Sequence, residues 1–184
     1  MDGIEILIEE HENIRRALRI FKQDLIIFMN QGGTSEDIVK FRAYIDFIKY
    51  YADHHHHHKE EEILFKVMGE ELGEIAQKLV QYGMMQEHST ARFLVQEMED
   101  GLNRYEVSGE DESKLDFLGS ATAYVHHLDA HIERENKVVF PFAIRELSSD
   151  SIQFVNKSSR MFEEKEAKSR EHYLGWLENL QEGQ

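Results

Sequence analysis

The stretch that decides the fold runs from Asp53 to Phe65 and reads DHHHHHKEEEILF. A shorter echo, His131 to Phe140, reads HIERENKVVF. In both, a His stands four residues before a Glu, so on a helix the two side chains project from one face, one turn apart. Imidazole and carboxylate at this spacing indicate a metal site. The histidine run lies inside the chain and continues an apolar helical pattern on both sides, which argues against a purification tag.

Composition indicates one helical domain. The chain has 184 residues, of which 41% are hydrophobic and 31% charged, enough for a single domain with a real core. Strand signals are nearly absent, and the single proline is Pro141, so long helices are expected. A net charge of −15 repels a phosphate backbone and an anionic membrane surface. We therefore expect neither nucleic acid nor membrane as a partner.

The sequence has no cysteine, which excludes disulfides, thiolate zinc sites, cysteine-ligated iron–sulfur clusters and CxxCH haem attachment. Any metal is then held by nitrogen and oxygen. The acidic start differs from a signal peptide, and the apolar runs are too short to span a bilayer. These features predict a cytoplasmic protein.

Four segments carry apolar residues at alternating steps of four and three, which is typical of helices packed in a bundle. They cover about residues 3–30, 35–68, 84–105 and 117–142. Gly32 and Gly33 separate the first pair, and Gly69, Gly73 and Gly83 predict a connector over residues 70–82 that turns aside from the third helix.

Short connections predict an all-α, antiparallel up-down-up-down four-helix bundle over residues 1–147. Residues 148–184 are expected to form an additional C-terminal helix packed on the same domain. This helix is also a possible homodimer contact.

Polar residues interrupt the four seams at one level of the bundle. They are His11, His57, Glu61, His88, His131 and Glu135. Three His-to-Glu pairs of the histidine run have the right spacing, 56 to 60, 57 to 61 and 58 to 62, and an α-helical register favours the middle pair. That register also turns His54 inward, and His55 and His56 away from the core.

Burying these groups unpaired would cost several kcal/mol for each ionised group, so the sequence predicts bound cations. Two carboxylates from different helices can bridge, which favours two ions ~3.5–4 Å apart. Imidazole and carboxylate ligands suit iron, with manganese or zinc as alternatives.

Four motifs in order make residues 4–146 similar to the hemerythrin-like, cation-binding family. The motifs are Glu10-His11, His57-x-x-x-Glu61 before Leu64-Phe65, Glu87-His88 with Arg92, and His131-Ile132-x-x-Glu135 before Phe140-Pro141. The resemblance implies an oxo- or hydroxo-bridged di-iron centre. Its ligands would be His11, His57, Glu61, His88, His131 and Glu135. Around them we expect hydrogen-bond partners or alternative ligands, namely Asp53, His54, Glu87, Arg92 and His127.

The sequence departs from the oxygen-carrying hemerythrins at two positions. Their third helix offers two histidines four residues apart, whereas Arg92 stands four after His88 here. Their fourth helix carries its carboxylate five residues after the His, whereas Glu135 comes four after His131. We therefore expect a protein that binds or consumes oxygen, nitric oxide or peroxide, in sensing, detoxification or iron handling. An oxygen carrier, an iron–sulfur repair factor and a metal-free helical scaffold remain alternatives.

Overall fold

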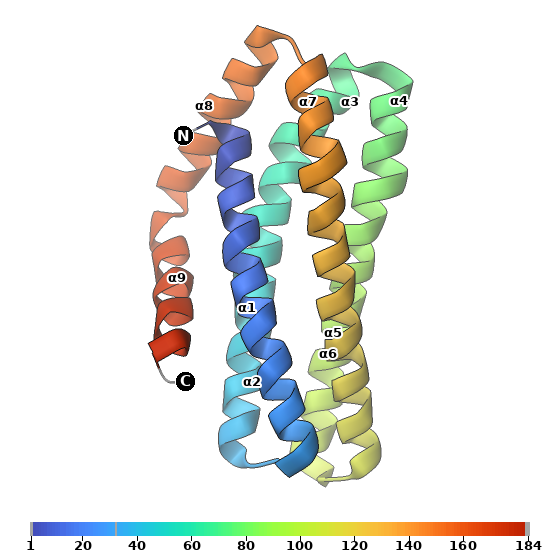
Figure 1. Ribbon diagram of the computed structural model, residues 1–184, viewed down its shortest axis with the longest axis vertical. Coiled ribbons are helices and arrows are strands. Elements are labelled where there is room, and N and C mark those ends of the chain that lie inside the picture. The colour runs from blue at the N-terminus through green and yellow to red at the C-terminus, as the bar shows by residue number, and fades with distance from the viewer. Residues whose placement is uncertain (1, 32, 183–184) are drawn as a thin grey trace.

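The computed structural model describes residues 2–31 and 33–182, and these contain helices and turns but no strand (Figure 1). The predicted all-α class is confirmed. The predicted glycine stop at Gly32 lies outside the described residues. Just after it, the Thr34 hydroxyl accepts from the Asp37 N–H, and the Asp37 carboxylate accepts from the Thr34 N–H at 2.8 Å. This capping box starts the second helix.

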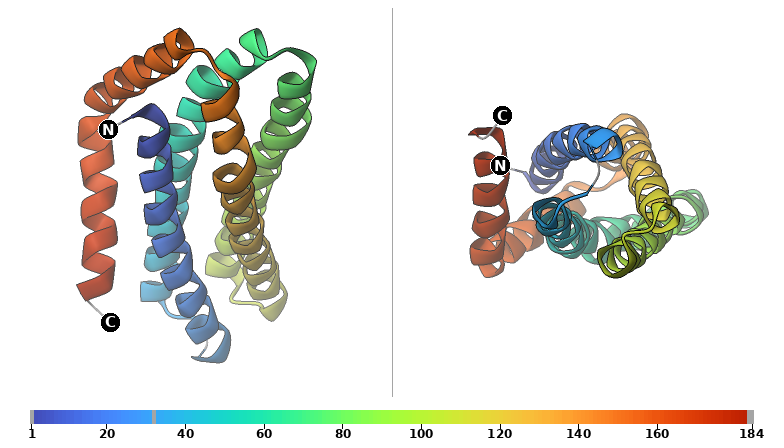
Figure 2. Two further views of the ribbon diagram at one scale, coloured as in Figure 1. Left: turned by 45° about the horizontal axis from the view of Figure 1, so that its top comes forward. Right: turned by 90° about the horizontal axis from the view of Figure 1, so that it is seen from below.

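The elements from Gly3 to Glu146 form four long helices around a common core, and Figures 1 and 2 show that these helices run up and down. Bundle helix 1 is α1 (Gly3–Gln31). Bundle helix 2 joins α2 (Ser35–Phe47), η1 (Ile48–His57), η2 (Glu60–Phe65) and α3 (Lys66–Glu71). Bundle helix 3 joins α4 (Gly73–Lys78), η3 (Leu79–Met84) and α5 (Met85–Ser108). Bundle helix 4 joins α6 (Asp111–Arg134), η4 (Glu135–Val139) and α7 (Phe140–Glu146).

The segments labelled η are π-helical, which means that each carbonyl accepts from the N–H five residues further along the chain. On bundle helix 2 they change the spacing of the buried face to four residues. Its members are each at most 3% exposed: Tyr44, Ile48, Ala52, His56, Glu60, Leu64 and Met68. In a regular α-helix a four-residue step drifts by ~40°, or ~240° over the six steps of this line. The wider π-helical turns keep the line facing the core.

The predicted connector over residues 70–82 is wrong. Bundle helix 3 runs without a break from Gly73 to Ser108, and the chain reverses only around Leu72 and Gly73. Gly73 has a φ of +69°, a conformation that favours glycine. Gly83 lies inside the helix, where a glycine costs only about 1 kcal/mol. Burial of Ala76 and Val80 on the same helix offsets this cost.

The core consists of two apolar clusters separated by polar side chains. The lower apolar cluster, toward the α1–α2 turn in Figure 1, includes Phe21, Phe28, Phe41, Phe117 and Leu128. The upper apolar cluster, near α3, α4 and α7, includes Leu7, Leu64, Met68, Met84 and Phe140. On every bundle helix the histidines of the predicted site fall between these two clusters. The bundle thus presents them at one level.

The C-terminal extension consists of two helices, α8 (Ser149–Lys165) and α9 (Ala167–Glu182), separated by a turn at Glu166. The first packs along α1, and the second lies against α1 and η1 (Figure 2). The Ser148 side chain caps α8 by accepting from the Ser151 N–H. Among the described helices, none combines the length and apolar character needed to cross a lipid bilayer.

The backbone of α6 lies close to Gly101 of α5, which yields a stability prediction. A Cβ there would lie 2.8 Å from the Phe117 backbone nitrogen, so Gly101→Ala should destabilise the fold by about 1–3 kcal/mol through overpacking. Gly119→Ala is the matched control, since its Cβ would meet nothing within 4 Å. It should stabilise α6 by roughly 0.5–1 kcal/mol. Denaturant unfolding measures both, and equal stabilities would contradict the close packing.

Candidate metal centre

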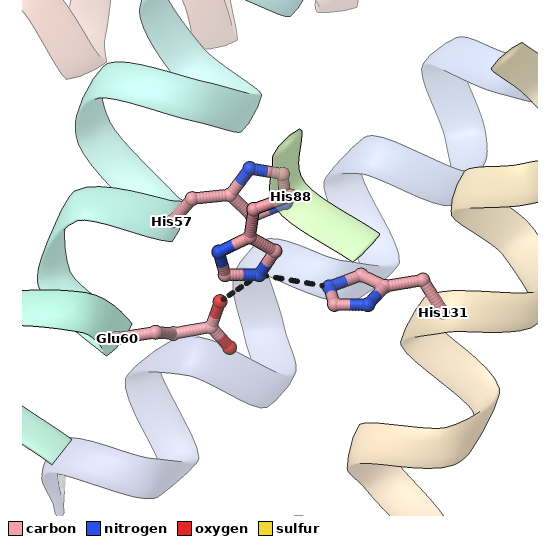
Figure 3. A group of neighbouring side chains, drawn as sticks. All are labelled: His57, Glu60, His88 and His131. Carbon is pink, nitrogen blue, oxygen red and sulfur yellow. Dashed lines mark hydrogen bonds and ion pairs between the residues drawn. The ribbon is translucent and has the colours of Figure 1, made fainter. Parts of the chain in front are cut away.

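Two groups of buried side chains meet between the apolar clusters. The three-His group, drawn in Figure 3, consists of His57, Glu60, His88 and His131. The two-His group consists of His11, His56, Glu60 and Glu135. In each group every residue offers one nitrogen or oxygen, and these atoms lie within 4.8 Å of one another. Each of the seven residues is at most 2% exposed.

The two carboxylates face both groups. Glu60 Oε1 lies 3.5 Å from His56 Nε2, and Glu60 Oε2 lies 3.5 Å from His88 Nε2. Glu135 Oε2 lies 3.2 Å from His11 Nε2 and 3.1 Å from His131 Nε2. The two groups are therefore adjacent, and Glu60 and Glu135 stand between them.

Each histidine ring of the two groups makes a hydrogen bond through Nδ1, on the side facing away from the centre. This bond determines whether Nε2, on the side facing the centre, carries a proton or a lone pair. His88 Nδ1 donates to Glu61 at 2.7 Å, and His131 Nδ1 donates to Glu87 at 2.8 Å, because an ionised carboxylate only accepts. In the neutral rings the opposite Nε2 atoms then carry lone pairs, and they face each other at 3.1 Å (Figure 3). Two such lone pairs repel unless a proton or a metal cation lies between them.

Other atoms of the centre also lack a hydrogen-bond donor. Within the described residues, seven of its buried atoms have no hydrogen-bond partner: His11 Nε2, His56 Nε2, His57 Nε2, and both carboxylate oxygens of Glu60 and Glu135. Leaving such atoms unpaired costs about 1–3 kcal/mol each. Imidazole nitrogens and carboxylate oxygens directed at one place are the donors that a divalent cation needs. The residues therefore fit a bound metal.

Electrostatics show where protons stand when no cation is bound. Burial and the neighbouring Glu135 carboxylate raise the pKa of Glu60 well above its usual range. Burial lowers the pKa of His56 to about 3. Burial would also lower the pKa of His131, but Glu135 and Glu87 outweigh it and raise that pKa to about 9. Protons on Glu60 and His131 thus take the place of a cation, and cation binding releases them.

Several residues expected around the ligands do lie there. Asp53 accepts from His57 Nδ1 at 3.1 Å and from Arg92 Nε at 2.9 Å. Glu87 pairs with His131, and its backbone carbonyl accepts from His127 Nε2 at 2.8 Å. The burial of Glu87 would raise its pKa, but His131 and Arg134 lower it to about 2.

The α-helical register assumed for bundle helix 2 is wrong. His54 is exposed, and His55 and His56 are buried instead of pointing away. Glu61 is only half-buried and bonds His88 and Arg92, whereas Glu60 lies in both groups. The π-helical turns cause the shift, since they favour the pair 56 to 60 over 57 to 61. His11, His57, His88, His131 and Glu135 do meet at the centre.

Sequence reasoning therefore missed His56 and Glu60. A signal for them was present, because Tyr44, Ile48 and Ala52 precede His56 at steps of four. Nothing in the periodicity of bundle helix 4 indicated Asn136, whose side-chain oxygen accepts from His11 Nδ1 at 2.8 Å.

A second buried network lies beside the two-His group. Glu10 accepts from His56 Nδ1 at 2.9 Å and also pairs with Lys59. Lys59 is only 1% exposed, and its ammonium group pairs in turn with Glu163 of α8. His55 Nε2 lies 3.0 Å from both Glu10 and Glu163. The lysine supplies the positive charge that this network needs, and it joins α1 and α8 to bundle helix 2.

A comparison with protein families agrees with this geometry. The model of the hemerythrin HHE cation-binding domain matches residues 2–143. The chain belongs to this hemerythrin family. A comparison with curated proteins gave no match. Family membership and the buried His and Glu groups together fit a metal-binding, hemerythrin-like protein.

Metal uptake tests the corrected register. Glu60→Gln keeps the size of the side chain but removes the charge that both groups share, so bound metal should fall well below the value for the unchanged protein. The exposed neighbour Glu62→Gln is the matched control and should retain full uptake. Elemental analysis of dialysed protein measures both. Full occupancy in Glu60→Gln would contradict the placement of Glu60.

Loss of metal in Glu60→Gln must be separated from unfolding. In the metal-free protein Glu60 is protonated, so glutamine replaces a neutral side chain of the same size, and the metal-free variant should be about as stable as the metal-free parent. Thermal unfolding with a chelator present measures this.

Lys59→Met tests the second network. The change leaves Glu10 and Glu163 buried without their shared cation, which should cost about 3–5 kcal/mol of unfolding free energy. Lys66→Met, at an exposed position of the same bundle helix, should stay within about 0.5 kcal/mol. Chemical denaturation distinguishes the two, and equal effects would argue against the network.

Proposed function

We propose that this chain is a non-haem di-iron protein that binds or reacts with oxygen, nitric oxide or peroxide, in sensing, detoxification or iron handling. The observation that carries the proposal is the convergence of seven buried, unpartnered nitrogen and oxygen atoms on two adjacent groups. A mixed imidazole and carboxylate set without sulfur suits iron better than zinc, which favours closed tetrahedral sites.

Two ions are favoured over one because Glu60 and Glu135 face both groups. If each carboxylate serves both ions, the three-His group supplies three nitrogens and two oxygens, while the two-His group supplies two of each. An octahedral ion then keeps positions for solvent or a small ligand, with more of them at the two-His group. Bound iron would supply the redox chemistry at these positions.

The surroundings favour a very small ligand. All seven residues of the two groups are almost fully buried, so a bulky substrate has no direct access to them. A cavity of about 110 Å³ adjoins the three-His group, and its walls include His57, Ala91, Val95 and Tyr124. A diatomic molecule or a peroxide fits within this cavity, with room left for water.

A metal-free helical scaffold is the alternative from another class. It is disfavoured because a metal-free centre neutralised by protons on Glu60 and His131 would still leave Nε2 of His11, His56 and His57 without a hydrogen-bond partner in the core. An oxygen carrier and an iron–sulfur repair factor share the centre with our proposal, so reactivity has to distinguish them.

Iron loading and reaction with oxygen test the proposal. Metal-free protein supplied with ferrous iron under anaerobic conditions should bind about two ions per chain. Mixed with oxygen in a stopped-flow spectrometer, it should oxidise rapidly and stay oxidised when oxygen is removed. Zinc-loaded protein is the control and should show no absorption change, since zinc has no redox chemistry.

Two results would contradict this function. An oxygenated species that returns to ferrous iron on deoxygenation would indicate an oxygen carrier. Absence of iron binding with the fold intact would favour the scaffold.

A further inference from the structure

We propose that the three-His group and the two-His group bind metal with unequal affinity, and that the three-His group fills first. The inference rests on the proposed di-metal function and adds an order of loading to it. It follows from what lies behind each histidine, on the side of the ring that faces away from the metal position.

Every ring of the three-His group donates from Nδ1 to a carboxylate. The partners of His57, His88 and His131 are, in order, Asp53 at 3.1 Å, Glu61 at 2.7 Å and Glu87 at 2.8 Å. Arginines hold all three carboxylates. Arg92 bonds both Asp53, at 2.9 Å, and Glu61, at 2.8 Å, and Arg134 pairs with Glu87 at 2.8 Å.

The two-His group has weaker support. His11 Nδ1 donates at 2.8 Å to the side-chain oxygen of Asn136, which is a neutral amide. His56 does donate to a carboxylate, Glu10, but the buried ammonium of Lys59 offsets that charge. Arg92 and Arg134, in contrast, are 41% and 45% exposed, so water screens their charges.

An anionic acceptor behind an imidazole makes the ring a better metal ligand, and losing such a partner typically costs about 10–100-fold in metal affinity. Glu60 belongs to both groups, and Glu135, a member of the two-His group, also lies 3.1 Å from His131 Nε2, so both carboxylates are within reach of each group. The difference in affinity must therefore come from the histidines. All three histidines of the three-His group have a carboxylate partner, whereas in the two-His group His56 has a carboxylate and His11 has only an amide. The first ion therefore enters the three-His group, and the second binds more weakly and exchanges faster.

Titration of the metal-free protein with cobalt(II) tests this order without any redox reaction. Isothermal calorimetry and the visible cobalt absorption should both show two steps, with the first at least about 10-fold tighter than the second. Glu87→Gln should weaken the first step by about 10–100-fold. Glu133→Gln is the matched control, because Glu133 also pairs with an arginine, Arg15, but bonds no histidine; it should leave both steps unchanged.

A gain of affinity cannot result from misfolding, so a second variant complements the first. Asn136→Asp gives His11 an anionic acceptor and should tighten the second step by about 10-fold, narrowing the gap between the steps. Asn103→Asp, on the exposed side of α5, adds the same charge far from any histidine of the centre and should change neither step.

The outcomes separate the two proposals. Two cobalt ions bound in one step of equal affinity would overturn the order of loading and leave the di-metal function intact. The same holds if Glu87→Gln weakens only the second step, or if Asn136→Asp tightens only the first. A folded protein that binds no cobalt and no iron would overturn the di-metal function itself.

Discussion

The rest of the structure depends on the cost of burying charged and polar atoms without hydrogen-bond partners. Glu60 and Glu135 lie fully buried between two apolar clusters, and while the surrounding histidines are neutral their oxygens accept no hydrogen bond within the described residues. Lone pairs concentrated in this way repel each other strongly where water is excluded. The bundle tolerates them because a cation, or protons on Glu60 and His131, can neutralise the site. Everything around the centre acts to keep the lone pairs directed inward.

That direction is set from outside the centre. Because Nδ1 of each ring donates outward, to Asp53, Glu61, Glu87, Asn136 or Glu10, each Nε2 faces the metal position. The outer partners come from all four bundle helices, so the tautomers of the histidines depend on the assembled fold and not on any one helix. The C-terminal extension contributes as well. Glu163 of α8 pairs with Lys59 and also accepts from Arg170 of α9, and Lys59 pairs with Glu10, the acceptor of His56.

The sequence was sufficient for the helices and for the level of the site, because apolar periodicity and the positions of His11, His88 and His131 do not depend on local helix width. It was not sufficient for the register of the histidine run. A period of 3.6 residues predicted Glu61, and π-helical turns placed Glu60 there instead. Their signal, apolar residues at steps of four before His56, does not fit that period. The continuous bundle helix 3 was missed for a related reason: the weak local preference of Gly83 was overridden by packing.

The two buried networks show why ligand-type residues close together are not sufficient evidence for a metal. Glu10, His55 and Glu163 approach one another as closely as the members of the other two groups do. Their carboxylates, however, receive the Lys59 ammonium, which carries both the positive charge and the hydrogens that buried oxygens need. Around Glu60 and Glu135 the described residues direct lone pairs inward and no lysine or arginine reaches the oxygens. What distinguishes a metal centre from an ion-pair network in this fold is therefore whether a cationic side chain reaches the buried carboxylates. Lys59 reaches Glu10 and Glu163, and no such side chain of the described residues reaches Glu60 and Glu135.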